Sequence, residues 1–200
     1  VNSAMLKGSL NNLGLASSAN VSFQWGRSSG NYTVETTPQV MTVPGAFSAN
    51  LTGLSSGTTY YFCAKAVSNP IAYGIEKFFT TASLVELNAP PKVGPGGSFY
   101  ATVNITGVQN FDAASYYVSF NPSVLRLDYV YSGNIGGTTI PVDVWNQIDE
   151  GGGTFVIVQN VPGLGGANGS GYLATLKFYV RGSLGQSSSI SLSNGTLSST

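Results

Sequence analysis

PPKVGPGGSFYATVNIT, residues 90–106, opens the part of the chain that decides the fold. Its first eight residues are rich in Pro and Gly, which favour turns, and its last nine are mostly apolar, aromatic or β-branched, which favour a strand. Residues 113–120, AASYYVSF, predict a second strand that runs into NPSVL at 121–125. The turn GSG at 169–171 then starts YLATLKFYV at 172–180. The second half of the chain is therefore expected to consist of strands joined by tight turns.

The order of these landmarks resembles the cohesin family of bacterial scaffolding and cell-surface proteins, in which the middle landmark usually reads Asp-Pro-x-Val-Leu. Here that landmark begins with Asn121, which suits a turn before proline as Asp does. The resemblance covers a little over half of the chain and implies a jelly-roll sandwich that binds a partner. That partner would be dockerin, a small helical module that carries calcium itself, so no cofactor is implied for this chain.

Composition excludes several classes of function. Eight basic and eight acidic residues cancel, so the chain has no basic field for nucleic acid or anionic lipid. Histidine is absent, which removes the usual general base and the usual metal ligand. A single cysteine, Cys63, has no second cysteine with which to form an internal disulfide. We therefore expect a protein that is not an enzyme and that is held together by packing and strand pairing.

The first 81 residues alternate short apolar runs with turn residues at the spacing typical of a β-sandwich. The segment LSSGTTY at 54–60 resembles the tyrosine-corner turn of fibronectin type III domains, and Trp25 fits the same resemblance. We therefore predict an all-β chain of two tandem β-sandwiches. Residues 1–83 would be fibronectin type III-like and residues 84–200 a cohesin-like jelly-roll sandwich.

Strand alternation identifies a candidate surface for binding a partner in the second domain. Successive side chains of a strand point to opposite faces, so bulky residues turned inward leave their neighbours outside. The cohesin resemblance implies that three such strands form the flat face that receives dockerin. The candidate partner-binding residues are Ser115, Tyr117, Val156, Val158, Lys177 and Tyr179, with Trp145 near the edge of the face. Lys177 and Arg181 would then meet acidic groups of the partner.

Two other interpretations remain open at this point. Aromatic side chains also bind sugars by stacking, so a carbohydrate-binding module would use Tyr117, Trp145, Tyr172 or Tyr179. A purely structural module would have its exposed sheet face covered by a neighbour. Type I cohesins tend to carry an Asn and an Asp where this chain has Ala113 and Ser115, which affects the choice of partner.

Carboxylates near Trp145 are the one arrangement that could suggest chemistry or a metal. Asp143 with Asp149 or Glu150 could act as a glycosidase pair or hold calcium, but their spacing around a turn fits solvated side chains better. We therefore expect no catalytic residues and no metal site. No run approaches the length of a membrane span, so this segment is not expected to insert into a membrane, and the family resemblance implies an extracellular or cell-surface location.

Overall fold

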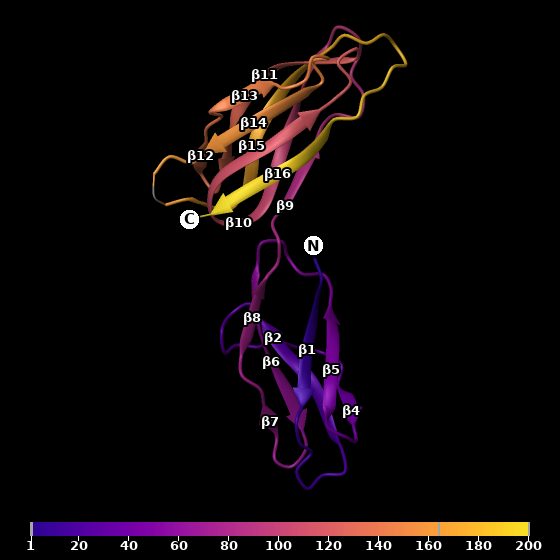
Figure 1. Cartoon of the computed structure of the whole chain (residues 1–200), viewed down its shortest axis with the longest axis vertical. Coiled ribbons are helices and arrows are strands. Elements are labelled where there is room, and N and C mark those ends of the chain that lie inside the picture. Colours follow the sequence, from indigo (N-terminus) through magenta and orange to yellow (C-terminus); the bar gives the residue numbers. More distant parts are fainter. Residues whose placement is uncertain (1, 164, 200) are drawn as a thin grey trace. The chain divides into compact units, whose positions relative to one another are not determined.

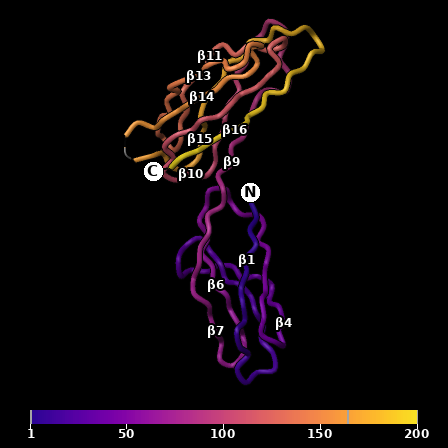
Figure 2. The backbone as a smooth tube through the Cα atoms, viewed as in Figure 1, coloured from indigo at the N-terminus to yellow at the C-terminus, as the bar shows by residue number. Residues whose placement is uncertain are grey.

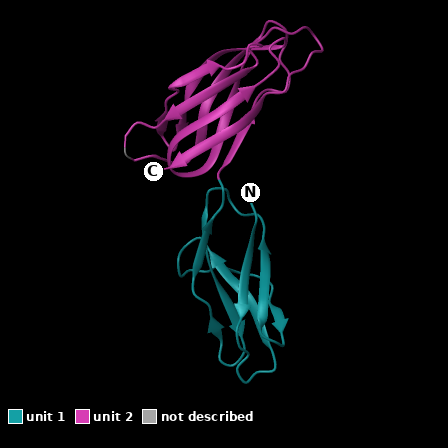
Figure 3. Ribbon diagram, viewed as in Figure 1, with its two compact units in different colours: residues 1–82 teal, residues 83–200 magenta. Residues whose placement is uncertain are grey.

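The computed structural model describes residues 2–163 and 165–199. Every regular element in these residues is a β-strand, and the sheets form sandwiches, so the predicted all-β class is confirmed. The chain divides into two compact units, residues 1–82 and 83–200 (Figure 3).

The first unit is built from one sheet of two strands and one sheet of six. In the smaller sheet β1 pairs with β5, while β2 and β6 are the centre of the larger one. The strands of this unit are β1 (Ala4–Leu10), β2 (Ala19–Gly26), β3 (Val34–Glu35), β4 (Gln39–Met41), β5 (Gly45–Leu51), β6 (Thr59–Val67), β7 (Ala72–Tyr73) and β8 (Lys77–Thr80).

Aromatic side chains fill the core of the first unit. The rings of Phe23 on β2 and Phe47 on β5 lie with their centroids 4.8 Å apart, so they join the two sheets. Gly8 on β1 faces this pair, and a Cβ there would come within 2.8 Å of the Phe47 ring. A larger residue at this position would therefore displace the Phe47 ring, which favours glycine.

Tyr60, at the start of β6, fixes the turn that precedes it. Its hydroxyl accepts a hydrogen bond of 2.9 Å from the backbone N–H of Ser55. Its ring is buried between Trp25, at 5.6 Å, and Phe79, also at 5.6 Å. The tyrosine thus ties a loop to the core through one polar and two aromatic contacts.

The described residues of the second unit form eight strands. Figures 1 and 2 show the path of the chain through them. These strands are β9 (Leu84–Asn88), β10 (Ser98–Ser119), β11 (Leu125–Ile135), β12 (Thr138–Ile140), β13 (Val144–Gln147), β14 (Thr154–Asn160), β15 (Ala167–Val180) and β16 (Ser191–Ser199). The two halves of β10 have different neighbours. The first half pairs with β9 and β15, and the second half pairs with β14 and β16.

The strand β10 changes neighbours at its midpoint. Gly107 and Asn110 have positive φ angles of 67° and 50°, and the pairing with β15 shifts register on either side of Val108. The backbone N–H of Asn110 donates to the Asn168 side-chain oxygen at 2.8 Å, which compensates the irregular backbone. The bend separates a sheet ordered β12-β11-β15-β10-β9 from a sheet ordered β13-β14-β10-β16.

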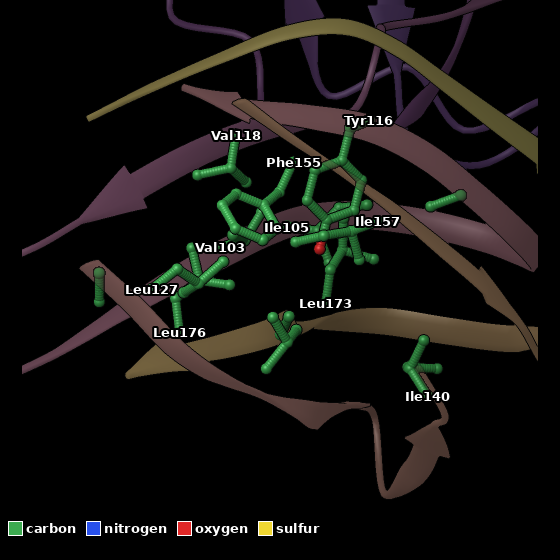
Figure 4. Packing of buried hydrophobic residues seen from close by; sticks show 14 of the residues in the cluster. Val103, Ile105, Tyr116, Val118, Leu127, Ile140, Phe155, Ile157, Leu173 and Leu176 are labelled. Carbon is green, nitrogen blue, oxygen red and sulfur yellow. The ribbon is translucent and has the colours of Figure 1, made fainter. Parts of the chain in front are cut away.

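The inner sides of these two sheets pack against each other (Figure 4). Phe120, which follows β10, contacts Phe155 of β14 at 5.9 Å and Phe178 of β15 at 5.1 Å between ring centroids. Leu176 and Ile157, one from each sheet, are fully buried in the same core. The outer sides of the two sheets therefore face in opposite directions, which decides where each candidate residue lies.

One polar group crosses this core. Gln159 of β14 is fully buried, and its amide donates to the carbonyl of Leu173 on β15 at 2.7 Å. Its side-chain oxygen accepts a hydrogen bond of 3.1 Å from the Tyr116 hydroxyl. Because each of these buried polar groups has a partner, the glutamine links the sheets without an unpaired atom.

Candidate protein-binding face

The outer side of the sheet β13-β14-β10-β16 carries four of the seven candidate residues. We call it the Tyr117 face. It is formed by aligned rows, because residues paired across antiparallel strands point to the same side. In one row Val158 pairs with Ser115 and Val144, and in the next Val156 pairs with Tyr117 and Asn146. The Tyr117 face is lined by Ser115, Tyr117, Val144, Asn146, Val156, Val158 and Thr196.

The centre of the Tyr117 face is apolar and its border is polar. Val156, Val158 and Tyr117 are half-buried, and Val144 is 39% exposed. At one end the hydroxyls of Ser119 and Thr154 lie 3.3 Å apart, and at the other Asn160 donates its amide to Asp143. Apart from Asp143 at this border, the lining residues carry no charge. An apolar centre with a hydroxyl and amide rim is the usual composition of a protein interface.

Two candidate residues lie on the opposite side of the sandwich, so the predicted single face is wrong for them. Lys177 and Tyr179 belong to β15, which pairs with β11 and the first half of β10. Their side chains do point outward, as alternation predicts, but from the other sheet. Alternation shows which residues of a strand share a face, and it does not show which sheet the strand joins.

Trp145 belongs to β13, which is an edge strand of its sheet, and its side chain lies on the inner side of that strand. It pairs with the buried Ile157, and its ring contacts Phe155 at 5.9 Å. On its other side the ring approaches Tyr129 of β11 at 6.1 Å, with the two planes 63° apart. Trp145 therefore closes the side of the sandwich between the two sheets instead of lining the Tyr117 face.

The outer side of the opposite sheet has a different composition. We call it the Tyr131 face. It is lined by Tyr100, Thr102, Tyr129, Tyr131, Thr175, Lys177 and Tyr179. Arg126 forms an ion pair with Asp128 and lies over the Tyr179 ring at 4.9 Å. The hydrogen bond from Arg126 holds the pKa of Asp128 below its ordinary value. This face is therefore aromatic and charged.

Two of the carboxylates near Trp145 accept hydrogen bonds from neighbouring groups of the fold. Asp149 accepts hydrogen bonds from the N–H groups of Gly153 and Thr154, at 3.0 and 2.7 Å, and so holds the turn before β14. Asp143 accepts from Asn160. Among the described residues no three acidic or cysteine side chains gather in a way that could hold a metal ion.

The four residues named as possible sugar-stacking groups are not together. Tyr117 lies on one outer face, Tyr179 on the other, and Trp145 at the edge between the sheets. Tyr172 pairs with Asn134 and Asn104, near the middle of β15 and away from Tyr179.

Sequence reasoning missed Val144, Asn146 and the whole of β16. The run VWNQ of β13 is too short for its alternation to be recognised. The run SLSNGTLSS of β16 contains only two apolar residues, and its serines resemble a loop. The pairing of Thr196 with Ser115 shows that it is a strand of the Tyr117 face.

One comparison with known proteins identifies a family for the second unit. A family model described as "Cohesin domain" matches residues 85–200. No curated protein matches the chain. In the part of the chain that the structure describes, no helix is long and apolar enough to cross a membrane.

Several solved structures are similar in fold. One is a non-cellulosomal cohesin from the archaeon Archaeoglobus fulgidus, with 20% identity over 52% of this chain and 69% of that one and a TM-score of 0.41. Another is the sixth cohesin of scaffoldin B from Acetivibrio cellulolyticus, solved in complex with a dockerin, with 18% identity over 60% and 87% and a TM-score of 0.46. The major pilin SpaD of Corynebacterium diphtheriae aligns with 99% of this chain and 65% of its own, with 11% identity and a TM-score of 0.43.

Proposed function

The chain belongs to the cohesin family, and we propose that residues 84–200 bind a dockerin-like protein module through the Tyr117 face. Cohesin domains are non-catalytic binding modules, so the question for this chain is which surface meets which partner. The observation that carries the proposal is the apolar centre formed by Tyr117, Val156 and Val158 on the outer side of a four-stranded sheet.

The composition of this face favours a partner that offers apolar side chains and hydroxyl or amide groups. Tyr117 supplies a large ring, and the serines and threonines around it supply donors and acceptors at the rim. Buried aromatic anchors surrounded by polar groups carry most of the energy of protein interfaces. Ala113 and Ser115 stand where type I cohesins tend to have Asn and Asp, so the partner would rely less on hydrogen bonds to this strand.

The sequence suggested that Lys177 and Arg181 meet acidic groups of the partner, but these two residues do not belong to the Tyr117 face. Lys177 lies on the Tyr131 face, on the other sheet, and Arg181 directly follows the same strand. A module docked on the Tyr117 face would therefore meet no lysine or arginine among its lining residues. Electrostatic attraction should therefore contribute little to the rate of association with the partner.

The test is a titration of the full chain with a panel of dockerin modules, with calcium and again with chelator. We expect saturable heat that disappears when the calcium carried by the partner is removed. The Tyr117→Asp/Val158→Asp double variant should bind at least roughly a hundredfold more weakly, because it places two charges in the apolar centre.

Tyr100→Asp is the matched control, because it makes the same exchange on the Tyr131 face. The control should bind as the unchanged chain does, and circular dichroism should show that all variants are folded. Unchanged affinity in the folded double variant would contradict the proposed face.

For residues 1–83 we propose a fibronectin type III-like module that serves as a spacer. The hydrogen bond from the Ser55 N–H to the Tyr60 hydroxyl supports this assignment, since it matches the tyrosine-corner arrangement. A fragment of residues 84–200 should then bind a dockerin module with the affinity of the whole chain, to within about threefold. A larger loss of affinity in the fragment would mean that the first unit takes part in binding.

We also propose that the parent protein is exported and displays this pair of modules outside the cell. Membership of the cohesin family supports this location. Protease treatment of intact cells that carry the parent protein should remove both modules, and their protection would contradict the location.

A further inference from the structure

Four aromatic rings form a continuous row across the Tyr131 face and over its edge. Consecutive ring centroids lie 6.2 Å apart between Tyr100 and Tyr131, 4.6 Å between Tyr131 and Tyr129, and 6.1 Å between Tyr129 and Trp145. We call these four side chains the aromatic row. They come from β10, β11 and β13, so the fold assembles the row from distant parts of the sequence.

The tyrosines of the row are open to solvent. Tyr100 is 55% exposed, Tyr129 50% and Tyr131 41%. Tyrosines that only complete a core are mostly covered, as Tyr116 and Tyr60 are in this chain. Large apolar surface exposed in a connected group is a mark of a binding site.

A hollow of about 400 Å³ lies at the Trp145 end of the row. It is lined by Tyr129, Val130, Tyr131, Ser132, Val142 and Trp145, none of which is charged. The strand β12 pairs only with the last three residues of β11, from Gly133 on. No described strand therefore borders the outer edge of β11 beside the hollow, and its backbone groups can bond a ligand.

We propose that the aromatic row binds a neutral, linear polysaccharide, with Tyr129 and Tyr131 as the principal stacking residues and Trp145 at the end of the row. The C–H faces of pyranose rings pack on aromatic rings, while sugar hydroxyls need donors and acceptors at the sides. The row supplies the rings, and the tyrosine hydroxyls, Ser132 and the edge of β11 supply the polar groups. The lining of the hollow carries no charge, which matches a neutral glycan, and a row of rings matches a chain of repeated units. Lys177, which pairs with both Tyr100 and Tyr129, can donate hydrogen bonds to sugar hydroxyls beside the row.

This site is separate from the Tyr117 face proposed for the protein partner. The two lie on the outer sides of opposed sheets, except for Trp145, which lies at the edge between the sheets. One domain could therefore hold a protein module and a polysaccharide together, and each activity can be removed without the other.

The experiment measures binding of the full chain to cellohexaose, xylohexaose, mannohexaose and chitohexaose, each at up to millimolar concentration. The Trp25→Phe chain is used for fluorescence, because it leaves Trp145 as the remaining tryptophan. We expect at least one of these glycans to change the Trp145 emission with saturation. Tyr131→Ala and Tyr129→Ala should each weaken that binding roughly tenfold.

Two further variants complete the design. Trp145→Ala should also weaken glycan binding. If loss of the half-buried tryptophan unfolds the domain, Tyr131→Ala still tests the proposal. Tyr117→Ala is the control on the opposite face and should bind the glycan unchanged. The proposal would be overturned if none of the four glycans showed saturable binding. It would also be overturned if glycan binding persisted unchanged in Tyr131→Ala and Tyr129→Ala. Loss of dockerin binding in Tyr131→Ala would overturn it as well, by assigning the row to a protein partner.

Discussion

The Tyr117 face and the Tyr131 face are the two outer sides of one sandwich, and they share the strand β10. The first half of β10 contributes Tyr100 to one, and the second half contributes Tyr117 to the other. One face has a centre of valines with a hydroxyl rim, and the other has exposed tyrosines beside an ion pair. The two surfaces of this one domain therefore suit ligands of different chemistry.

The largest expected effect on stability comes from removing a core side chain that packs between the two sheets. Phe178 is fully buried, stacks on Phe99 at 5.4 Å and meets Phe120 from the opposed sheet. Phe178→Ala should lower the free energy of unfolding by about 4 kcal/mol, because it leaves a cavity between the sheets. Denaturant unfolding measures the loss.

Tyr179→Ala is the control for this prediction, since Tyr179 is the next residue but points outward. Its cost should be below about 1 kcal/mol. Equal losses in the two variants would mean that β15 is not oriented as described.

Next in size is the polar link between the sheets. Gln159→Leu keeps the size of the side chain but leaves the Leu173 carbonyl and the Tyr116 hydroxyl without their partner. The variant should be destabilised by about 2 kcal/mol. Tyr116→Phe removes one bond of the same network and should cost about 1 kcal/mol. A stabilised Gln159→Leu chain would show that the link is not required to join the sheets.

Salt distinguishes the two faces as sites for the protein partner. The lining of the Tyr117 face carries no lysine or arginine, whereas the Tyr131 face has Lys177 beside Arg126 and Asp128. Raising the salt from about 0.05 M to about 0.5 M should change the dissociation constant for a dockerin module less than about threefold. A loss of affinity well beyond that range would favour the charged face.

The smallest effect concerns the ion pair of the Tyr131 face. Because the hydrogen bond from Arg126 holds the pKa of Asp128 below its ordinary value of 3.8, the pair stabilises the fold above that value. This contribution is lost as the pH falls through the lowered pKa. Asp128→Asn should show a slightly smaller decrease of melting temperature on acidification than the unchanged chain. Identical pH profiles would mean that the exposed pair contributes nothing measurable.

Much of the local structure could be predicted from alternation and turn residues. In β14 and β15 the buried positions, such as Phe155, Ile157, Leu176 and Phe178, are those that the period of two predicts. The outward positions of Tyr117, Val156 and Val158 follow from the same pattern. These features depend on neighbours within a strand, which the sequence contains directly.

The assembly of the strands could not be predicted in the same way. Placing Lys177 on the face opposite Tyr117 required knowing that β15 pairs with β11 and not with β14, and this pairing joins residues far apart in the chain. The bend at Gly107 and Asn110, which sends β10 into a second sheet, has no signal in alternation. The aromatic row was missed for this reason, because its four rings come from three separate strands.

The most direct test of the central claim is amide chemical-shift mapping of the isotope-labelled full chain as a binding dockerin module is added. We predict that the shifted amides concentrate at 113–119, in β14 and in β13, while those of β11 and of 175–179 stay in place. Shifts centred on β11 and 175–179 would place the partner on the Tyr131 face and contradict the account.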